Sequence, residues 1–573
     1  MAARRRHRGN GPAPRDEPVH VHELLGSLSR RVDQTRPADG ARQRLHPAAS
    51  ATVFGKPAPE LLTGPRSMTM NKTTKKRKSL LGLLAVGAVL ATAGCVDTQI
   101  TGVIIEDDIE DPNLMVPFVR GINSELHDNM RDFSGVWWFA GSATDDFNND
   151  GTSSSGEEIL EYRNYSDRPG NFPWAQLHEA AWAGYYGVHV TNRVFAEEAA
   201  SHPLIARSWI ISGWAERMMG ELFCESIYNY GPDAGALMGP NDQYDPSQIV
   251  QTDSIMRRSV NAMQNALAVA EAAVASGAPT PDGDSRIFDP LKLMYAAHGG
   301  IAQAAMLMGD WDLAVQHAAQ VPDDFILYSH ADPEVEDNGW FDVSFQNDDF
   351  TLWNTPVHRV FHDDPRVPWV KCGEWRSDTL RTTHTRSARD IIDTGRCDFA
   401  AGYGGEFRAE SNRMPLYSSL KSETEGLLTR PDGETGEDAD FPMVRGTEML
   451  LIRAEKALMD GNLSQFANLV NQGRAVYGMD PIETPATAGA LEYPNALDDG
   501  WSILDGERYT LMHLEGRRFA DMRRWQHPYI TEAHAINPRV EAENGAARLA
   551  FCMPIADIEC DANGDITCPG VGS

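Results

Sequence analysis

The sequence predicts an all-α protein built from antiparallel helical hairpins, with a loop-rich insertion and an irregular C-terminal tail. Two observations predict this class. Over most of the chain beyond residue 170, apolar residues recur at spacings of three and four, which is typical of helices with one buried face. The alternation of apolar and polar residues that indicates a half-buried strand is scarce throughout.

The expected helices form two groups on either side of the insertion. The first helix carries Leu177 and Tyr185 on one face, and Pro203 stands at a position suited to the first turn of the next. Residues 322–440 are rich in Asp, Gly, Pro and aromatic residues without helical spacing, so they are assigned to the insertion. Residues 539–573 form the tail. The expected helices are 174–200, 204–230, 246–275, 289–308, 311–320, 443–459, 463–477 and 503–525.

Two pairs of neighbouring helices resemble each other. In one pair Ala297 precedes Gly309 and Ala314 follows it, and in the other Gly461 and Ala467 take the corresponding places. Small residues let two helices pack closely, and the glycine ends the first of them. This arrangement is typical of a tetratricopeptide unit. Because the regular period of roughly 34 residues is missing, the units are expected to be degenerate, and any antiparallel helical hairpin fits the same pattern.

A secretion signal precedes the helical region. Residues 75–78 are all basic, an apolar stretch covers 80–90, and small residues then lead to Cys95. The basic residues would hold the leader at the cytoplasmic face, and the apolar stretch is shorter than the roughly 20 residues that span a bilayer. We therefore assign 68–94 as a lipoprotein signal peptide. The alternative is an ordinary signal peptide that happens to end near a cysteine.

Cys95 is the predicted site of lipidation. Its thiol is expected to carry a diacylglycerol, and two or three acyl chains such as palmitate would make an effectively permanent membrane anchor. Residues 95–112 are acidic and have no apolar periodicity, so they are assigned as the tether between the lipid and one domain that covers 113–573.

The 67 residues before the signal are unexpected, because a signal should stand at the start of a chain. They contain clustered arginines, many Ala, Pro and Gly residues, and no apolar periodicity. A basic arm that binds nucleic acid is the alternative, but such an arm ahead of an export signal makes little functional sense. We therefore expect residues 1–67 to be a start-site artefact and translation to begin at Met68 or Met70.

The part of the chain beyond the leader is strongly acidic. The whole chain has a net charge of −31, whereas residues 1–94 hold 17 Lys and Arg against 6 Asp and Glu. The remaining residues therefore have a net charge of −42. A surface this acidic argues against nucleic-acid binding and against docking on anionic lipid.

Six cysteines remain after the lipidated one, an even number that suits an oxidising compartment. Cys560 and Cys568 bracket a short polar loop and are candidates for a disulfide. Cys372 and Cys397 are candidates to close a longer loop. Cys224 lies in an apolar helical stretch and is interpreted as a buried thiol. Six cysteines allow many pairings, so the connectivity stays open.

A series of short motifs follows in order along the chain. They are Ala215-Glu216-Arg217, Asp364-Pro365-Arg366, Glu448 with Arg453-Ala454-Glu455, Glu507-Arg508, Glu515-Gly516-Arg517, Asp521, and Met553-Pro554-Ile555. Their order and spacing resemble the SusD/RagB family of outer-membrane nutrient-binding lipoproteins, over essentially all of residues 96–573. Pro232, directly after Gly231, departs from the family's usual turn there.

The resemblance implies a lipid-anchored protein on the outer membrane that faces the cell surface. It would capture an oligomeric nutrient, with a glycan favoured and glycopeptide and peptide left open. It would then deliver this nutrient to a SusC-like TonB-dependent transporter barrel, of which it would be the lid. The alternative is an exported helical-repeat scaffold that assembles other proteins without binding a small ligand.

An enzyme is not expected. Glu507 and Glu515 are the carboxylates that could form an acid–base pair, and the arginines at 508, 517 and 518 are placed to keep both ionised. A general acid needs a raised pKa, so this setting favours a structural role. Metal-protease, phosphate-binding and serine-hydrolase motifs are absent from the sequence, and we expect no required cofactor.

One segment matches the spacing of a calcium-binding loop. Asp146, Asn148, Asp150, Gly151 and Glu157 occupy the positions that supply oxygens and the sharp turn in such loops. The sequence therefore predicts a Ca²⁺ site here. The alternative is a solvated polar loop, because Asp and Gly are abundant in this chain and no convincing helix follows.

Aromatic residues in loops supply the predicted ligand platform. Sugars stack their apolar faces on exposed aromatic rings while nearby polar groups bind the hydroxyls. In the family that the sequence resembles, loop aromatics of this sort hold the ligand, although any one tryptophan is more often part of a core. The candidates are Trp137, Trp138, Trp340, Trp353, Trp369, Trp375 and Tyr403.

Overall fold

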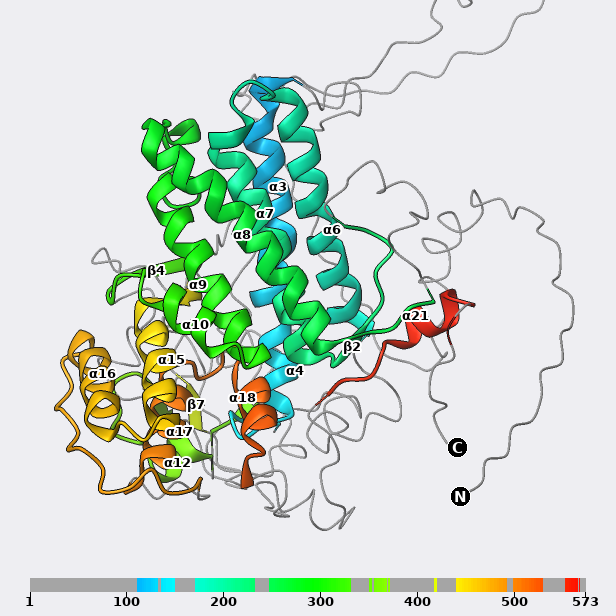
Figure 1. Ribbon diagram of the computed structural model, residues 1–573. Coiled ribbons are helices and arrows are strands. Elements are labelled where there is room, and N and C mark those ends of the chain that lie inside the picture. The colour runs from blue at the N-terminus through cyan, green and yellow to red at the C-terminus, as the bar shows by residue number, and fades with distance from the viewer. Residues whose placement is uncertain are drawn as a thin grey trace, which may run out of the picture. The chain divides into compact units, whose positions relative to one another are not determined.

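Helices dominate the structure, which confirms the predicted all-α class (Figure 1). All the residues described here belong to one compact unit, Ile104–Ser573. The predicted leader, Cys95 and most of the predicted tether lie outside them. The computed structural model describes residues 111–131, 135–149, 171–231, 247–330, 350–352, 355–367, 369–371, 417–419, 440–491, 498–528, 552–564 and 566.

The first part of this unit is a bundle of long helices around α7 (Pro203–Leu222), which contacts α3, α6, α8 and α9 and is buried over nearly its whole length. Small residues allow the close approach of α6 and α7. Ser212 Oγ donates a hydrogen bond to the carbonyl of Ala181 at 3.0 Å, and a Cβ on Gly184 would lie 2.7 Å from the Ser212 backbone nitrogen. The other elements here are η3 (Pro112–Leu114), α3 (Met115–Arg131), α4 (Val136–Ser142), α6 (Asn171–Val194), η5 (Ala199–Ser201), α8 (Thr252–Ser276), η7 (Pro281–Gly283) and α9 (Pro290–Met308).

The two predicted hairpins are present and have the same turn. The helix α9 ends at Gly309 and is followed by α10 (Trp311–Ala318), while α15 (Gly446–Met459) is followed through Gly461 by α16 (Leu463–Val476). Both glycines are left-handed, with φ of 75° and 73°. The next residue in each hairpin, Asp310 or Asn462, accepts a hydrogen bond from a backbone N–H in the following first turn. The helices α10 and α15 pack against each other, so the hairpins adjoin, as tetratricopeptide-like units do.

Strands are short and occur in antiparallel pairs within the described residues. The longest pair joins β4 (Ile326–Ser329) to β8 (Phe441–Arg445), which closes the two ends of the predicted insertion. The other strands are β1 (Asn148–Asn149) with β5 (Phe350–Thr351), β2 (Glu225–Ser226) with β3 (Val250–Gln251), and β6 (Trp369–Lys371) with β7 (Tyr417–Ser419). A short helix, α12 (Pro356–Arg359), lies between β5 and β6.

The helix predicted for 503–525 is wrong in one respect, because it is two helices. The first, α17, covers Gly500–Leu511, and the second, α18, covers Arg518–Trp525. Leu514 and Gly516 between them have φ of 60° and 74°, which no α-helix accommodates. Glu507 and Glu515 therefore do not share a helix.

Three further differences from prediction concern where elements end and which elements are present. The helix expected over 204–230 ends at Leu222, where β2 follows after a short turn. The helices α3 and α4 fall in a region for which no helix was predicted. In the tail, α21 (Asp557–Ala562) forms, and Met553 makes an isolated parallel bridge with Phe223. None of the helices in the described part of the chain combines the length and apolar character needed to cross a bilayer.

The hairpin glycines provide a test of the fold. We expect Gly461→Ala to lower the free energy of unfolding by about 1–2 kcal/mol, because its left-handed φ disfavours any residue with a Cβ. The control is Gly473→Ala in α16, where a Cβ would meet only Leu450 Cδ1 at 3.9 Å and should stabilise by roughly 0.5–1 kcal/mol. Urea unfolding followed by circular dichroism measures both. Shifts of the same sign and size would contradict the assigned turn.

Candidate functional site

Two of the predicted platform residues are part of the core. Trp137 and Trp138 lie on α4 and are 0% and 2% exposed. Trp138 stacks on Phe147 with ring centroids 5.0 Å apart, and Trp137 meets Trp138 edge to face at 5.6 Å. Neither indole presents a face to solvent, so the prediction that these two hold a ligand is wrong. Both rings are buried because all seven residues of the short helix α4 are buried.

The other platform candidates are not tested by the described residues. Trp340, Trp353, Trp375 and Tyr403 lie outside them. For Trp369 only the backbone is described, in strand β6, where it pairs with Ser419. These five residues stay predictions.

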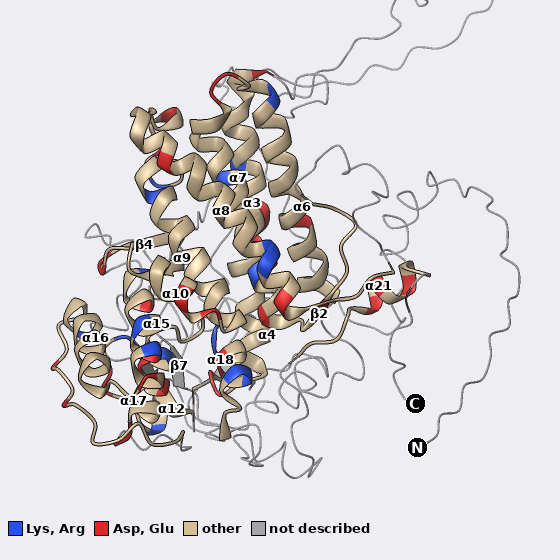
Figure 2. Cartoon of the chain, in the orientation of Figure 1, with Lys and Arg blue, Asp and Glu red and all other residues tan. Residues whose placement is uncertain are grey.

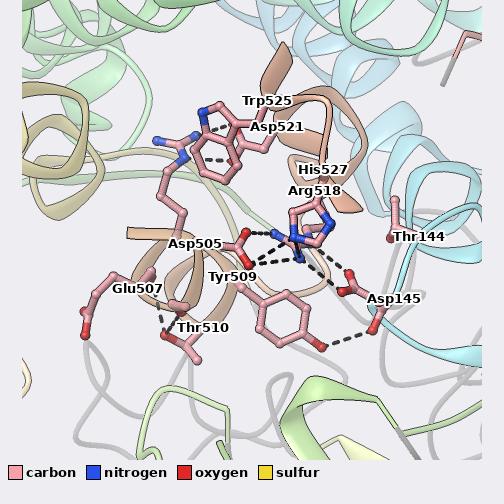
Figure 3. Close-up of polar contacts among 12 residues, drawn as sticks. Thr144, Asp145, Asp505, Glu507, Tyr509, Thr510, Arg518, Asp521, Trp525 and His527 are labelled. Atoms are coloured by element: carbon pink, nitrogen blue, oxygen red, sulfur yellow. Dashed lines mark hydrogen bonds and ion pairs between the residues drawn. The ribbon is translucent and has the colours of Figure 1, made fainter. Parts of the chain in front are cut away.

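The best-defined polar cluster surrounds Arg518, the first residue of α18 (Figure 3). Its guanidinium makes a bidentate contact with Asp145, through Nε at 2.8 Å and Nη2 at 3.0 Å, and a further ion pair with Asp505 of α17. His527 Nε2 lies 3.2 Å from Asp505, and Tyr509 donates its hydroxyl to the Asp145 carbonyl at 3.1 Å. The cluster is buried, and it joins segments more than 350 residues apart in the sequence.

Electrostatics keep Asp505 and Arg518 ionised. Burial by itself disfavours the charged form of Asp505, but the neighbouring Arg518 and His527 outweigh it and hold the pKa of Asp505 well below its usual range. Burial likewise disfavours charge on Arg518, yet Asp145 and Asp505 raise its pKa above the ordinary value. A carboxylate with such a low pKa cannot serve as a general acid.

A second ion-pair group links α18 to the α15–α16 hairpin and to α17. Arg508 contacts Asp521 at 2.7 Å through Nε and at 3.0 Å through Nη2. Arg524 pairs with both Asp521 and Glu455, and Trp525 donates its indole N–H to Glu455 at 2.7 Å. Three helices are therefore held in register by alternating charges that have little access to solvent.

The two carboxylates that sequence reasoning considered for catalysis have separate partners. Glu507 is bound by Arg366 and Arg474, each at 2.6 Å, and Glu515 pairs with Arg445 at 2.8 Å. The expectation of a structural role agrees with these contacts, but the arginines expected to pair with them, at 508, 517 and 518, bind other acids.

A small polar cavity lies where α7, β8 and α15 meet the turn before α18. Its charged lining is three arginines and three glutamates, and its volume is about 10 Å³, which is room for about one water molecule. It is too small for a sugar. Glu448 in its wall accepts hydrogen bonds from Gln303 and Arg517, each at 2.6 Å. Burial raises the pKa of Glu448 to about 7, although nearby arginines oppose the shift. The six charged residues are Arg217, Glu221, Arg445, Glu448, Glu515 and Arg517.

The predicted calcium loop is described only at its start. Asp146 is fully buried, and its Oδ1 lies 3.3 Å from His513 Nδ1. Asn148 contributes backbone to β1, and Asp150 and Glu157 lie outside the described residues. Within the described part of the chain no three His, Cys, Asp or Glu side chains form a group suited to a metal. Ca²⁺ binding stays a prediction.

The cysteines require one correction. Cys224 is not a free buried thiol, because it forms a disulfide with Cys552, with the two Cα atoms 5.3 Å apart. The bond ties the end of α7 to the C-terminal tail, next to the bridge between Phe223 and Met553. Cys560 is also in a disulfide. Its predicted partner Cys568 lies outside the described residues, as do Cys372 and Cys397.

Comparison with known proteins gives one family. A sequence model described as the SusD family matches residues 424–566, which include α15 to α21. No curated protein matches the chain.

The solved structures to which the chain is similar have low sequence identity to it. A SusD superfamily protein from Bacteroides vulgatus is 13% identical with a TM-score of 0.47, covering 80% of this chain and 98% of its own. A laminarin binding SusD-like protein is 12% identical with a TM-score of 0.48, covering 80% of this chain and 99% of its own. A SusD homolog from Bacteroides thetaiotaomicron is 14% identical with a TM-score of 0.48, covering 81% of this chain and 98% of its own.

Removing Arg518 should strongly destabilise the protein. We expect Arg518→Ala to lower the free energy of unfolding by about 3–5 kcal/mol, because two buried carboxylates lose their cation. The matched control is Lys456→Ala, which removes a partly exposed pair with Asp460 and should cost about 0.3–0.5 kcal/mol. Urea unfolding compares them, and failure of the first variant to fold is the extreme of the same result. Equal losses would contradict the central role of Arg518.

Glu448 should make stability depend on pH. Its folded pKa is near 7 and its ordinary value is 4.5, so between these values the folded chain keeps a proton that the unfolded chain has released. The free energy of unfolding therefore falls as the pH rises through this window. Glu448→Gln has no such proton. We expect the stability of wild type, relative to this variant, to fall from about pH 4.5 to about pH 7 and then to level off, as measured by urea titration. A pH-independent difference would contradict the raised pKa.

Proposed function

We propose that the chain is a member of the SusD/RagB family, a lipid-anchored protein of the outer membrane that binds a glycan at the cell surface. It would then pass the glycan to a TonB-dependent barrel transporter, for which it serves as the lid. The match of residues 424–566 to the SusD family model carries this proposal. SusD family proteins bind carbohydrate and are not enzymes, so the ligand would be captured unchanged.

The ion-pair scaffold supports a binding role of this kind. The matched segment contains Glu455, Glu507, Asp521 and Arg524, whose buried pairs hold α15, α17 and α18 rigidly together. One of these pairs reaches Arg366, which follows β5 in the region predicted as the loop-rich insertion. A rigid frame that positions loops lowers the entropy lost when those loops bind a ligand.

The leader supports the proposed location. A basic segment, a short apolar stretch and Cys95 occur in the order that a lipoprotein signal requires. The acidic body that follows has little electrostatic attraction to anionic lipid, so the lipid itself would supply attachment.

The test uses the full chain with a C-terminal tag, expressed in the cells that produce it. We expect it to fractionate with the outer membrane and to co-purify with a large TonB-dependent barrel after gentle solubilisation. Cys95→Ala is the control, and it should leave the membrane fraction because it has no thiol to lipidate. Recovery from the outer membrane with no barrel would contradict the lid and favour the scaffold alternative.

The ligand is tested with the same soluble Cys95→Ala chain. We expect retardation in native gels that contain a soluble polysaccharide, with laminarin and other glycans as separate trials. Alanine substitution of a predicted platform residue should reduce retardation where its ring stacks on the sugar. The residues to be substituted are Trp340, Trp353, Trp369, Trp375 and Tyr403. Binding to no glycan would contradict the proposed ligand class.

A further inference from the structure

The helices α3 and α6 carry two matched rows of residues, in which the glycine and the glutamates are exposed and the aromatic side chains are half-buried. Each row runs from an aromatic residue at one end to a glutamate at the other. The row on α3 ends at Phe118 and Glu125, seven residues apart, and the row on α6 ends at Tyr186 and Glu179, also seven apart. Seven residues of helix span about 10.5 Å, so the rows have the same length. None of these residues belongs to the ion-pair groups described above. The six residues are Phe118, Gly121, Glu125, Glu179, Trp182 and Tyr186.

The two rows run antiparallel, side by side. Phe118 and Tyr186 meet edge to face, with ring centroids 6.1 Å apart. At the other end Glu125 and Glu179 are close enough to interact: burial, and then repulsion from Glu179, raises the pKa of Glu125. Because both ends are aligned, the antiparallel register sets Gly121, in the middle of one row, opposite Trp182, in the middle of the other.

Trp182 is half-buried, and one face of its ring is already in contact with another aromatic ring. It stacks on Tyr186, with ring centroids 5.4 Å apart and an interplanar angle of 6°. Tyr186 lies one helical turn beyond Trp182 and Glu179 lies almost one turn before it, so the second indole face is on the glutamate side. The space next to Gly121 is open, because nothing lies within 4 Å of where its Cβ would be.

The two glutamates make this surface negative. Both are exposed, and neither carboxylate forms an ion pair with a described residue. Asp128 adds a third negative charge that also raises the pKa of Glu125. An indole face beside two like-charged carboxylates is complementary to a cation that has an apolar body.

The chain already contains a filled site with the same chemistry. Arg258 lies over the ring of Tyr228 at 3.9 Å and pairs with Glu216 at 2.7 Å. Tyr185 donates a hydrogen bond to the same glutamate at 2.9 Å and also faces the guanidinium. Aromatic faces and a carboxylate thus hold a cation inside this fold. At Trp182 the same groups are at the surface, where the cation must come from outside.

We propose that the α3–α6 surface binds an amino sugar, with the sugar ring on Trp182 and its ammonium group between Glu125 and Glu179. This rests on the proposed function of glycan binding and adds a second, charge-selective subsite. A neutral sugar would leave the two carboxylates uncompensated. A protein partner is disfavoured by size, because the rows span about 10.5 Å, whereas a stable interface needs roughly 800 Å² on each side.

The experiment is calorimetric titration of the soluble Cys95→Ala chain with oligomers of β-1,4-linked glucosamine. The matched ligand is the N-acetylated oligomer, which keeps the rings and loses the charge. We expect the amine form to bind at least about tenfold more tightly, a difference of about 1.4 kcal/mol. Its affinity should fall with added salt.

Four variants of this chain localise the binding. Trp182→Ala removes the stacking face, Glu125→Gln removes one charge, and Gly121→Leu fills the open place without altering charge or rings. Each should lower affinity for the amine oligomer by about tenfold or more. The control is Glu197→Gln, which removes an exposed carboxylate beyond the end of α6 and should have no effect. Thermal melts check that each variant is folded.

Two results would overturn the proposal. Equal affinity for the amine and acetylated oligomers, or no affinity for either, would exclude the charge-selective subsite. Tight binding of a lysine- or arginine-rich peptide without binding of the amine oligomer would assign the surface to a protein. Neither result bears on retardation by neutral polysaccharide, so failure here is distinguishable from failure of the proposed function.

Discussion

The buried contact of Arg518 with Asp145 and Asp505 is the constraint on which the other features depend. It brings the end of α4, the middle of α17 and the start of α18 to one point (Figure 3). Two buried ion pairs carry a desolvation penalty, so they add little net stability, but removing one partner is strongly unfavourable. The contact therefore specifies one arrangement of these helices. Further arginines form similar buried pairs with carboxylates around this contact. They are Arg445, Arg508, Arg517 and Arg524.

The ion pairs divide the described helices into a part rich in charge and a part with little charge. Charged residues within the described helices are concentrated where α15, α17 and α18 converge, while the α7 bundle is mostly uncharged (Figure 2). The buried pairs satisfy their own charges, and the small cavity among them admits little more than a water. Under the proposed function, ligand recognition would come from loops or from the outer faces of helices. The proposed α3–α6 surface is an outer face of this kind. Arg258 shows that aromatic rings and a carboxylate can hold a cation in this fold.

The aromatic residues show what sequence reasoning could and could not select. Trp137 and Trp138 stand in a loop-like context in the sequence, yet both lie on a short helix whose residues are all buried. Trp182 falls in an expected helix, and its spacing from Glu179 and Tyr186 places the three on one face of that helix. That signal was available. The missing information was α3, because its Gly121 and Glu125 complete the surface, and α3 was not predicted.

Residue spacing along the sequence was sufficient to predict the all-α class and the two hairpins with their glycine turns. These depend on spacings of a few residues, and local backbone geometry follows from such spacings. Tertiary structure decided which acid each arginine binds, that Cys224 pairs with Cys552, that the last long helix breaks near Leu514, and which tryptophans are enclosed. All four depend on contacts between segments far apart in the chain. Many pairings of such segments are compatible with one sequence, and packing selects among them.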